Sequence, residues 1–102
     1  MDLSRLELQA DLEDILGSDE VYFQPPDNLK MNYPAIVYEW GDEDVIYADN
    51  VKYRRRKRYS VTVITRDPDD DLPDKVGALP LSSFGRRFVV DQLYHTNYNV
   101  FF

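Results

Sequence analysis

Apolar residues near the start of the chain recur with the period of a helix. Between residues 2 and 16 they are spaced three and four apart: Leu3, Leu6, Leu8, Ala10, Leu12, Ile15 and Leu16. Acids occupy the positions expected to face solvent: Glu7, Asp11, Glu13 and Asp14. Asp2 is suited to cap the first turn, and Gly17 can take the left-handed conformation that closes the last one. The pattern predicts an amphipathic helix over residues 2–16.

The next apolar segments are extended rather than helical. Residues 21–23 are β-prone and lead into two consecutive prolines, so they predict an edge strand or a strand start. Residues 33–40 are rich in β-branched and aromatic residues and predict the first long strand. A glycine followed by three acids is expected to turn the chain at residues 41–44. Residues 45–48 then resume an extended pattern, and residues 49–50 have turn chemistry.

Strict alternation marks the middle of the predicted sheet. Tyr59, Val61 and Val63 fall on one face of an extended segment, residues 59–64. The intervening residues are serine, threonine and isoleucine, which suits a strand packed on one face and partly covered on the other. We expect this strand to lie at the centre of the sheet.

The C-terminal third predicts a loop, a short helix and a hairpin. Proline and crowded acids break the strand pattern at residues 66–71. Residues 72–79 carry apolar side chains at spacings of four and three, with a proline near the first helical position, and predict the helix. Residues 83–90 and 98–102 are β-prone, and residues 91–97 are expected to connect them in a terminal hairpin.

Together these elements predict a single domain, residues 1–102, of the α+β class. We expect a small, mainly antiparallel sheet of four to five strands, with the N-terminal helix and the second short helix packed on it. The chain has no cysteine, which excludes disulfides, thiolate metal sites and a cysteine nucleophile. An acidic N-terminal segment and the lack of a long apolar run predict neither a signal peptide nor a membrane span, so we expect a soluble protein made in the cytoplasm.

Charge is distributed unevenly along the sequence. Five consecutive cations stand in a chain of formal net charge −7, so the rest of the chain carries −12: Arg54, Arg55, Arg56, Lys57 and Arg58. The segment 53–59, with a tyrosine at each end, has three interpretations: a loop that binds nucleic acid, a loop that pairs with an acidic surface of a neighbouring subunit, or a solvated hairpin arm. We favour the second on sign complementarity. The candidate acidic partners are Asp42, Glu43, Asp44, Asp69, Asp70 and Asp71.

Other candidate chemistry is weak. Acids of residues 67–74 offer oxygen ligands, but the glycine and the closing glutamate of a calcium loop are missing, which favours a solvated loop before a helix. His95, the only histidine, would need Ser82 or Ser83 together with Asp91 to act in acyl transfer, and neither serine has a nucleophile-elbow pattern. The four glycines are scattered, so no phosphate loop is present. We expect no catalysis, no cofactor and no metal.

Short strings distributed over nearly the whole chain are typical of one known family. They are Tyr33-Pro34-Ala35-Ile36-Val37-Tyr38-Glu39, Ala48-Asp49-Asn50, Tyr59-Ser60-Val61-Thr62-Val63-Ile64, Arg66-Asp67-Pro68-Asp69, Pro73-Asp74-Lys75-Val76 and the closing segment 88–102. In these strings the sequence resembles the tail-completion, or tail-terminator, proteins found at the head-to-tail junction of long-tailed bacteriophages and prophages.

This resemblance implies a structural virion protein of the phage neck. It implies a small antiparallel or mixed sheet with flanking helices, assembled into a ring, commonly a hexamer, that terminates the tail tube and joins tail to head. The expected partners are further copies of the chain, the tail-tube protein, head-connector proteins and DNA passing through the channel without sequence readout. Head-closure and connector-adaptor proteins of the same junction, and a nucleic-acid-binding module using residues 53–59, are the alternatives.

Overall fold

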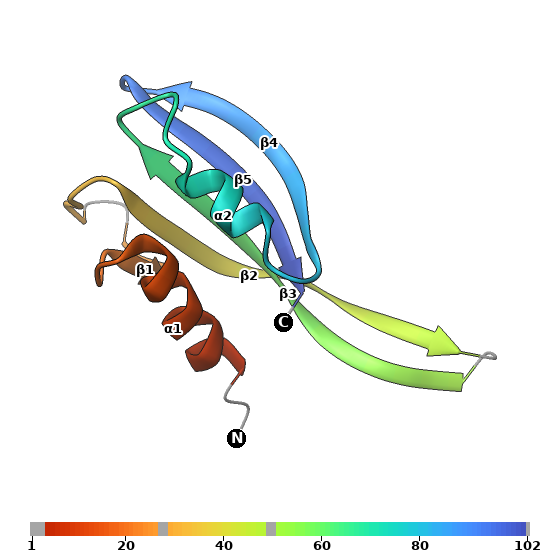
Figure 1. Cartoon of the computed structure of the whole chain (residues 1–102). Helices are drawn as coiled ribbons and strands as arrows, with labels where there is room; N and C mark the ends of the chain where they lie inside the picture. Colours follow the sequence, from red (N-terminus) through yellow and green to blue (C-terminus); the bar gives the residue numbers. More distant parts are fainter. Residues whose placement is uncertain (1–3, 27–28, 49–50, 102) are drawn as a thin grey trace.

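The computed structural model describes residues 4–26, 29–48 and 51–101, and for Ser4, 42–48 and 51–57 it describes the backbone alone. The elements in chain order are α1 (Ser4–Leu16), β1 (Val21–Phe23), β2 (Ala35–Ala48), β3 (Val51–Thr65), α2 (Leu72–Gly77), β4 (Ser82–Val90) and β5 (Leu93–Phe101). The five strands form one sheet in the order β1-β2-β3-β5-β4 (Figure 1). β1 runs parallel to β2, and every other neighbouring pair is antiparallel. The predicted α+β class, with two helices and a mainly antiparallel sheet, is confirmed.

The N-terminal helix buries only part of its apolar face. Leu8 and Leu12 are completely buried, whereas Leu6 is 51% exposed. Gly17 has a φ of +78° and donates its N–H to the Glu13 carbonyl at 2.8 Å, so it closes α1 as predicted. The predicted cap Asp2 lies outside the described residues.

The core lies between the two helices and one face of the sheet. Side chains from α1, α2 and four strands form a single buried cluster: Leu8, Leu12, Val21, Ile36, Tyr38, Tyr59, Val61, Val63, Leu72, Val76, Tyr98 and Val100. On β3 the residues Tyr59, Val61 and Val63 are buried, and Ser60 and Thr62 on the opposite face are half-buried. The prediction of a central strand with one closely packed face is therefore confirmed.

The turn predicted at residues 41–44 does not form. β2 runs through it as one strand, with a shift of register between Trp40 and Glu43. The physical reason is a β-bulge, which absorbs an extra residue without ending the strand. A Cβ atom at Gly41 would lie 2.8 Å from Arg58 Nε and 3.2 Å from the Arg58 carbonyl oxygen, so glycine permits the close approach of the two strands.

The terminal hairpin is tighter than predicted. Residues 93–97, expected in the connection, belong to β5, and the turn consists of Asp91 and Gln92 alone. Their φ values of +52° and +65° are those of a two-residue turn with both residues left-handed. The last strand is held in the sheet to its end, because Phe101 pairs with Arg58 and donates its N–H to the Leu81 carbonyl.

Candidate assembly surface

The β2–β3 hairpin continues well beyond the rest of the sheet (Figure 1). Pairing of β2 with β1 ends at Tyr38, and pairing of β3 with β5 ends at Arg58. Beyond these points the two strands pair only with each other within the described chain, as far as Ala48 and Val51. We call this extension, residues 41–48 and 51–57, the arm. Its backbone has two open edges, one along each strand.

The basic run lies in a strand, which matches the backbone of the third interpretation, a hairpin arm, and not that of the two interpretations that place it in a loop. Residues 54–58 belong to β3, and the register sets Glu43 opposite Lys57 and Asp44 opposite Arg56. Sequence reasoning assigned these acids to a neighbouring subunit, but the hairpin register brings two of them opposite the run in the same chain. The side chains of the predicted interface residues in the arm lie outside the described part: Asp42, Glu43, Asp44, Arg54, Arg55, Arg56 and Lys57.

Arg58 is the one predicted interface cation whose side chain is described. It is half-buried at the base of the arm, beside Gly41. Arg58 thus packs where the hairpin leaves the sheet. Its guanidinium lies beside Gly41 at the β-bulge and is not part of an exposed basic surface.

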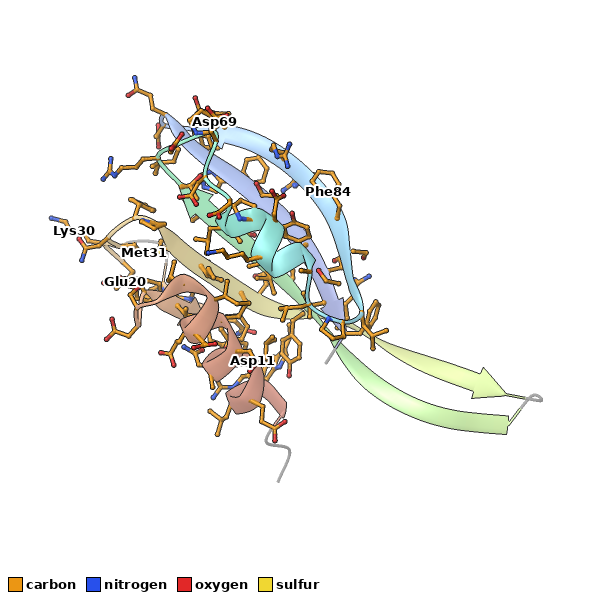
Figure 2. All side chains as sticks on the ribbon, in the orientation of Figure 1. Asp11, Glu20, Lys30, Met31, Asp69 and Phe84 are labelled. Carbon is orange, nitrogen blue, oxygen red and sulfur yellow. The ribbon has the colours of Figure 1, made fainter. Side chains whose placement is uncertain are left out.

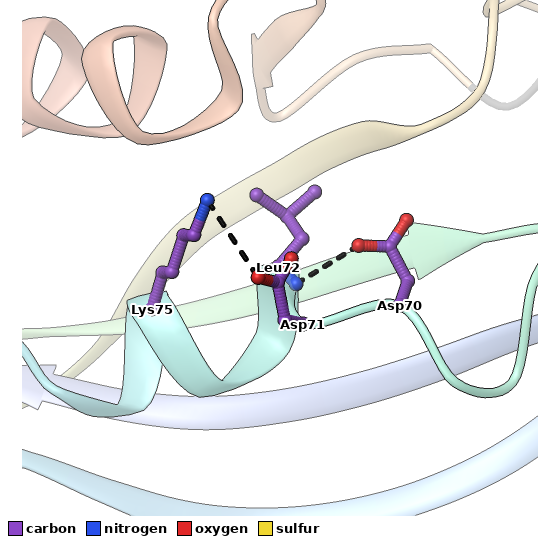
Figure 3. Close-up of polar contacts among 4 residues, drawn as sticks. All are labelled: Asp70, Asp71, Leu72 and Lys75. Atoms are coloured by element: carbon purple, nitrogen blue, oxygen red, sulfur yellow. Dashed lines mark hydrogen bonds and ion pairs between the residues drawn. The ribbon is translucent and has the colours of Figure 1, made fainter.

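The acids of the loop before α2, residues 67–71, form hydrogen bonds and an ion pair with their own neighbours in the chain. The Asp67 carboxylate accepts the N–H of Asp69 at 2.9 Å. The Asp70 carboxylate accepts the N–H of Leu72, also at 2.9 Å (Figure 3). Asp71 forms an exposed ion pair with Lys75 at 3.9 Å. These acids follow the end of β3 that lies farthest from the arm, so one subunit does not bring them to the basic run.

A cleft of about 630 Å³ opens between this loop, α2 and β4. Its polar lining is mixed in sign, with Asp69, Asp70 and Asp74 on one side and Arg87 on another. Among the described residues, no three histidine, cysteine or acidic side chains come together as a metal ligand set.

The Ser-His-Asp arrangement considered from the sequence, His95 with Ser82 or Ser83 and Asp91, does not form in the structure. His95 stacks on Phe88 with ring centroids 4.8 Å apart, and its Nδ1 lies 3.1 Å from the Leu93 carbonyl oxygen. The Ser83 hydroxyl donates to the carbonyl of Asn99 instead. His95 is a strand residue of the terminal hairpin, not a turn residue.

An exposed strand edge was missed by sequence reasoning. β4 is the outer strand next to β5, and it exposes Phe84 (57%), Val89 (57%) and Val90 (48%). Phe84 is labelled on this strand in Figure 2, and the Arg87 guanidinium lies 5.6 Å from its ring centroid. One feature of the sequence could have pointed to this edge: residues 82–90 contain no acid, although the chain as a whole is acidic. Beneath this edge, burial raises the pKa of Tyr98, and the neighbouring Asp74 adds to that rise.

No protein-family model matches this sequence, and no curated protein is similar enough to it to count as a match. Across the described part of the chain, none of the helices has the length and apolar character needed to cross a membrane.

Proposed function

We propose that this chain is a non-catalytic structural subunit of the head-to-tail junction of a long-tailed bacteriophage or prophage. In this role it forms a ring that terminates the tail tube and joins the tail to the head. Its partners are other copies of itself, the tail-tube protein and the head-connector proteins, and its location is the neck of the virion.

The observation that carries this proposal is the arm. Within the described chain the two strands of the arm pair only with each other, so the arm adds no pairing to the rest of the sheet. Open strand edges are templates for pairing with another chain, and proteins normally shorten or cover them. A long projecting hairpin is therefore an assembly element, which agrees with the ring implied by the sequence resemblance.

The charge of the chain supports a role beside moving DNA. A net charge of −7 gives the subunit a surface that repels phosphates overall, so a channel wall built from it does not grip the passing duplex. Two cations of the basic run, Arg56 and Lys57, sit opposite acids in the hairpin register, which weakens the case for the run as a nucleic-acid site.

Deletion of the gene from a phage or prophage that carries it tests the proposed role. We expect lysates with separate heads and tails and a loss of infectious particles, both restored by the intact gene on a plasmid. Joined, infectious particles in the deletion lysate would rule the neck function out.

A DNA-binding measurement separates the main rival. We expect a labelled DNA duplex to show no retention by the chain at physiological salt. Binding that falls steeply with salt, and is lost when the cations 54–58 are replaced by glutamate, would favour the nucleic-acid module instead.

A further inference from the structure

Within the part of the chain that the structure describes, β4 offers an unpaired backbone edge along most of its length. In a hairpin closed by a two-residue turn the flanking residues, here Val90 and Leu93, form the hydrogen-bonded pair. Alternation along the strand then directs the N–H and C=O groups of Val89 and Arg87 away from β5. At the other end the Ser82 N–H is bound by the Leu79 carbonyl, so the open part of the edge begins after Ser82.

The β2 strand of the arm offers a second open edge. Near the core this side of β2 is closed, because the Tyr38 carbonyl accepts the Gln24 N–H at 2.9 Å and the Gln24 side chain accepts the Trp40 N–H at 3.3 Å. From residue 41 to residue 48 no described segment continues this closure. We call residues 41–48 the arm's β2 edge.

Charge decides which open edges fit together. β4 carries Arg86 and Arg87 and no acid, so two β4 edges repel each other, and so do β4 and the arm's β3 edge with its basic run. The arm's β2 edge carries Asp42, Glu43 and Asp44. Of the two edges of the arm, it alone is opposite in sign to β4.

We propose that the arm's β2 edge of one copy adds as a strand to the β4 edge of a second copy, extending the sheet across the subunit boundary. The contact deepens the proposed function, since it rests on the self-assembly that the ring requires. It joins two different surfaces of the same chain, so each subunit both gives an arm and receives one, and such contacts close into rings or continue as filaments.

The contact must form between molecules. Asp44 pairs with Arg56, whereas Val89 pairs with Tyr94, which pairs in turn with Thr65. The stretch of β3 from Arg56 to Thr65 spans about 30 Å at about 3.3 Å per residue. A disulfide needs Cα atoms within roughly 7 Å, so cysteines at positions 44 and 89 can be joined only between two chains.

Charge reversal with rescue is the first test, read as the mass of the purified full chain by light scattering and native mass spectrometry. Replacing Arg86 and Arg87 with glutamate should weaken self-association at least about tenfold, as should replacing Asp42, Glu43 and Asp44 with lysine. Mixing the two variants should restore assembly, because an arm with lysines meets a β4 edge with glutamates.

A backbone test removes the dependence on charge. Val89→Pro deletes an N–H that points out of the edge and leaves the β5 ladder intact, so it should abolish assembly. Val89→Thr keeps both the N–H and the β-branched shape, and should assemble like the unmodified chain. Circular dichroism melts check that both variants fold.

Cysteine crosslinking locates the contact. The chain has no cysteine of its own, so Asp44→Cys and Val89→Cys introduce the only thiols. A mixture of the two variants should give a disulfide-linked pair under mild oxidation, well above the yield of either variant alone.

Two results would overturn the proposed contact. One is a chain that stays monomeric up to roughly 1 mM, the weak end of specific binding. The other is assembly that persists in Val89→Pro and in the charge-reversed variants. The second result would leave the neck function standing on another interface, since that function is judged by the gene deletion.

Discussion

At the scale of single residues, Tyr38 joins the N-terminal helix to the sheet. Its ring packs against Phe23 and Tyr59, with centroids 5.0 Å and 6.2 Å away. Its hydroxyl donates to the Gln9 side chain and accepts from Arg5. Burial raises the pKa of the Tyr38 phenol, and this outweighs the opposite effect of the nearby Arg5 charge.

The raised pKa of Tyr38 predicts a loss of stability in alkali. The unfolded phenol ionises near its ordinary pKa of 10, while the folded one holds its proton to higher pH. The contribution is therefore complete below pH 10 and is lost as pH rises from 10 through the folded pKa. Urea melts of Tyr38→Phe should show about 1 kcal/mol less stability at pH 7, from lost hydrogen bonds, and a shallower decline above pH 10. Equal declines in both proteins would contradict this account.

Gly85 is required by a close approach between strands. It lies at the β4 bulge, where an added Cβ would be 2.4 Å from Asn97 Oδ1 and 3.0 Å from the Asn97 carbonyl oxygen. The Asn97 carboxamide cannot shift freely, because it donates to Ser60 Oγ at 2.9 Å and Thr62 Oγ1 at 3.1 Å.

Gly85→Ala should therefore destabilise the fold by about 1–3 kcal/mol in urea melts, as overpacking does. In the double variant Gly85→Ala/Asn97→Ala the side-chain clash is gone and only the backbone contact remains. Its destabilisation should be smaller than the sum of the two single effects. Additive costs would show that the carboxamide is not the obstacle.

At the scale of elements, two adjacent aspartates at the start of α2 have different tasks. Asp70 accepts the Leu72 N–H, one of the first-turn donors that a helix leaves unpaired, whereas Asp71 makes only an exposed ion pair with Lys75 (Figure 3). α2 places Leu72 and Val76 in the core, so loosening its start lowers global stability.

Asp70→Ala should cost about 1 kcal/mol through the lost hydrogen bond to the Leu72 N–H, and Asp71→Ala, the matched control, under about 0.5 kcal/mol. Chemical denaturation of both variants beside the unmodified chain measures the difference. Equal losses of stability in the two variants would mean that negative charge near the start of α2, and not the Asp70–Leu72 hydrogen bond, stabilises the helix.

The predictable elements are those whose cause is local. The period of α1, the alternation of β3 and the proline-led start of α2 follow from neighbouring residues, and all three were predicted. The continuation of β2 depends on Arg58 lying against Gly41, a contact from another strand that no local pattern reveals. Asp91 and Gln92 lack the glycine that usually signals a two-residue turn, so the start of β5 was placed too late.

For the candidate assembly surface, the sequence revealed which segments are basic and which are acidic, but it did not reveal where these segments lie in the sheet. The arm and the open β4 edge both arise from how strands of unequal length pair, which is a property of the whole sheet. The register of Asp44 with Arg56 likewise depends on the bulge that precedes it.

At the scale of the whole molecule, the arm is separable from the fold. The molecule measures 47 × 27 × 23 Å, and the arm extends away from the helices and the other strands (Figure 1). Within the described chain, the strands of the arm pair only with each other. Removing the arm should therefore leave the core intact while removing one half of the proposed contact.

A variant in which a short glycine- and serine-rich loop joins Gly41 to Arg58 tests this separation, because Gly41 lies beside Arg58 where the hairpin leaves the sheet. We expect a cooperative melt close to that of the full chain, and a monomer by light scattering at concentrations where the full chain assembles. A control keeps the arm's length but neutralises the acids of its β2 edge with Asp42→Asn, Glu43→Gln and Asp44→Asn. It should fold and assemble more weakly than the full chain, since its β2 edge no longer attracts Arg86 and Arg87. If the shortened chain still assembles, the arm is not the joint; if it unfolds, the arm belongs to the folding unit after all.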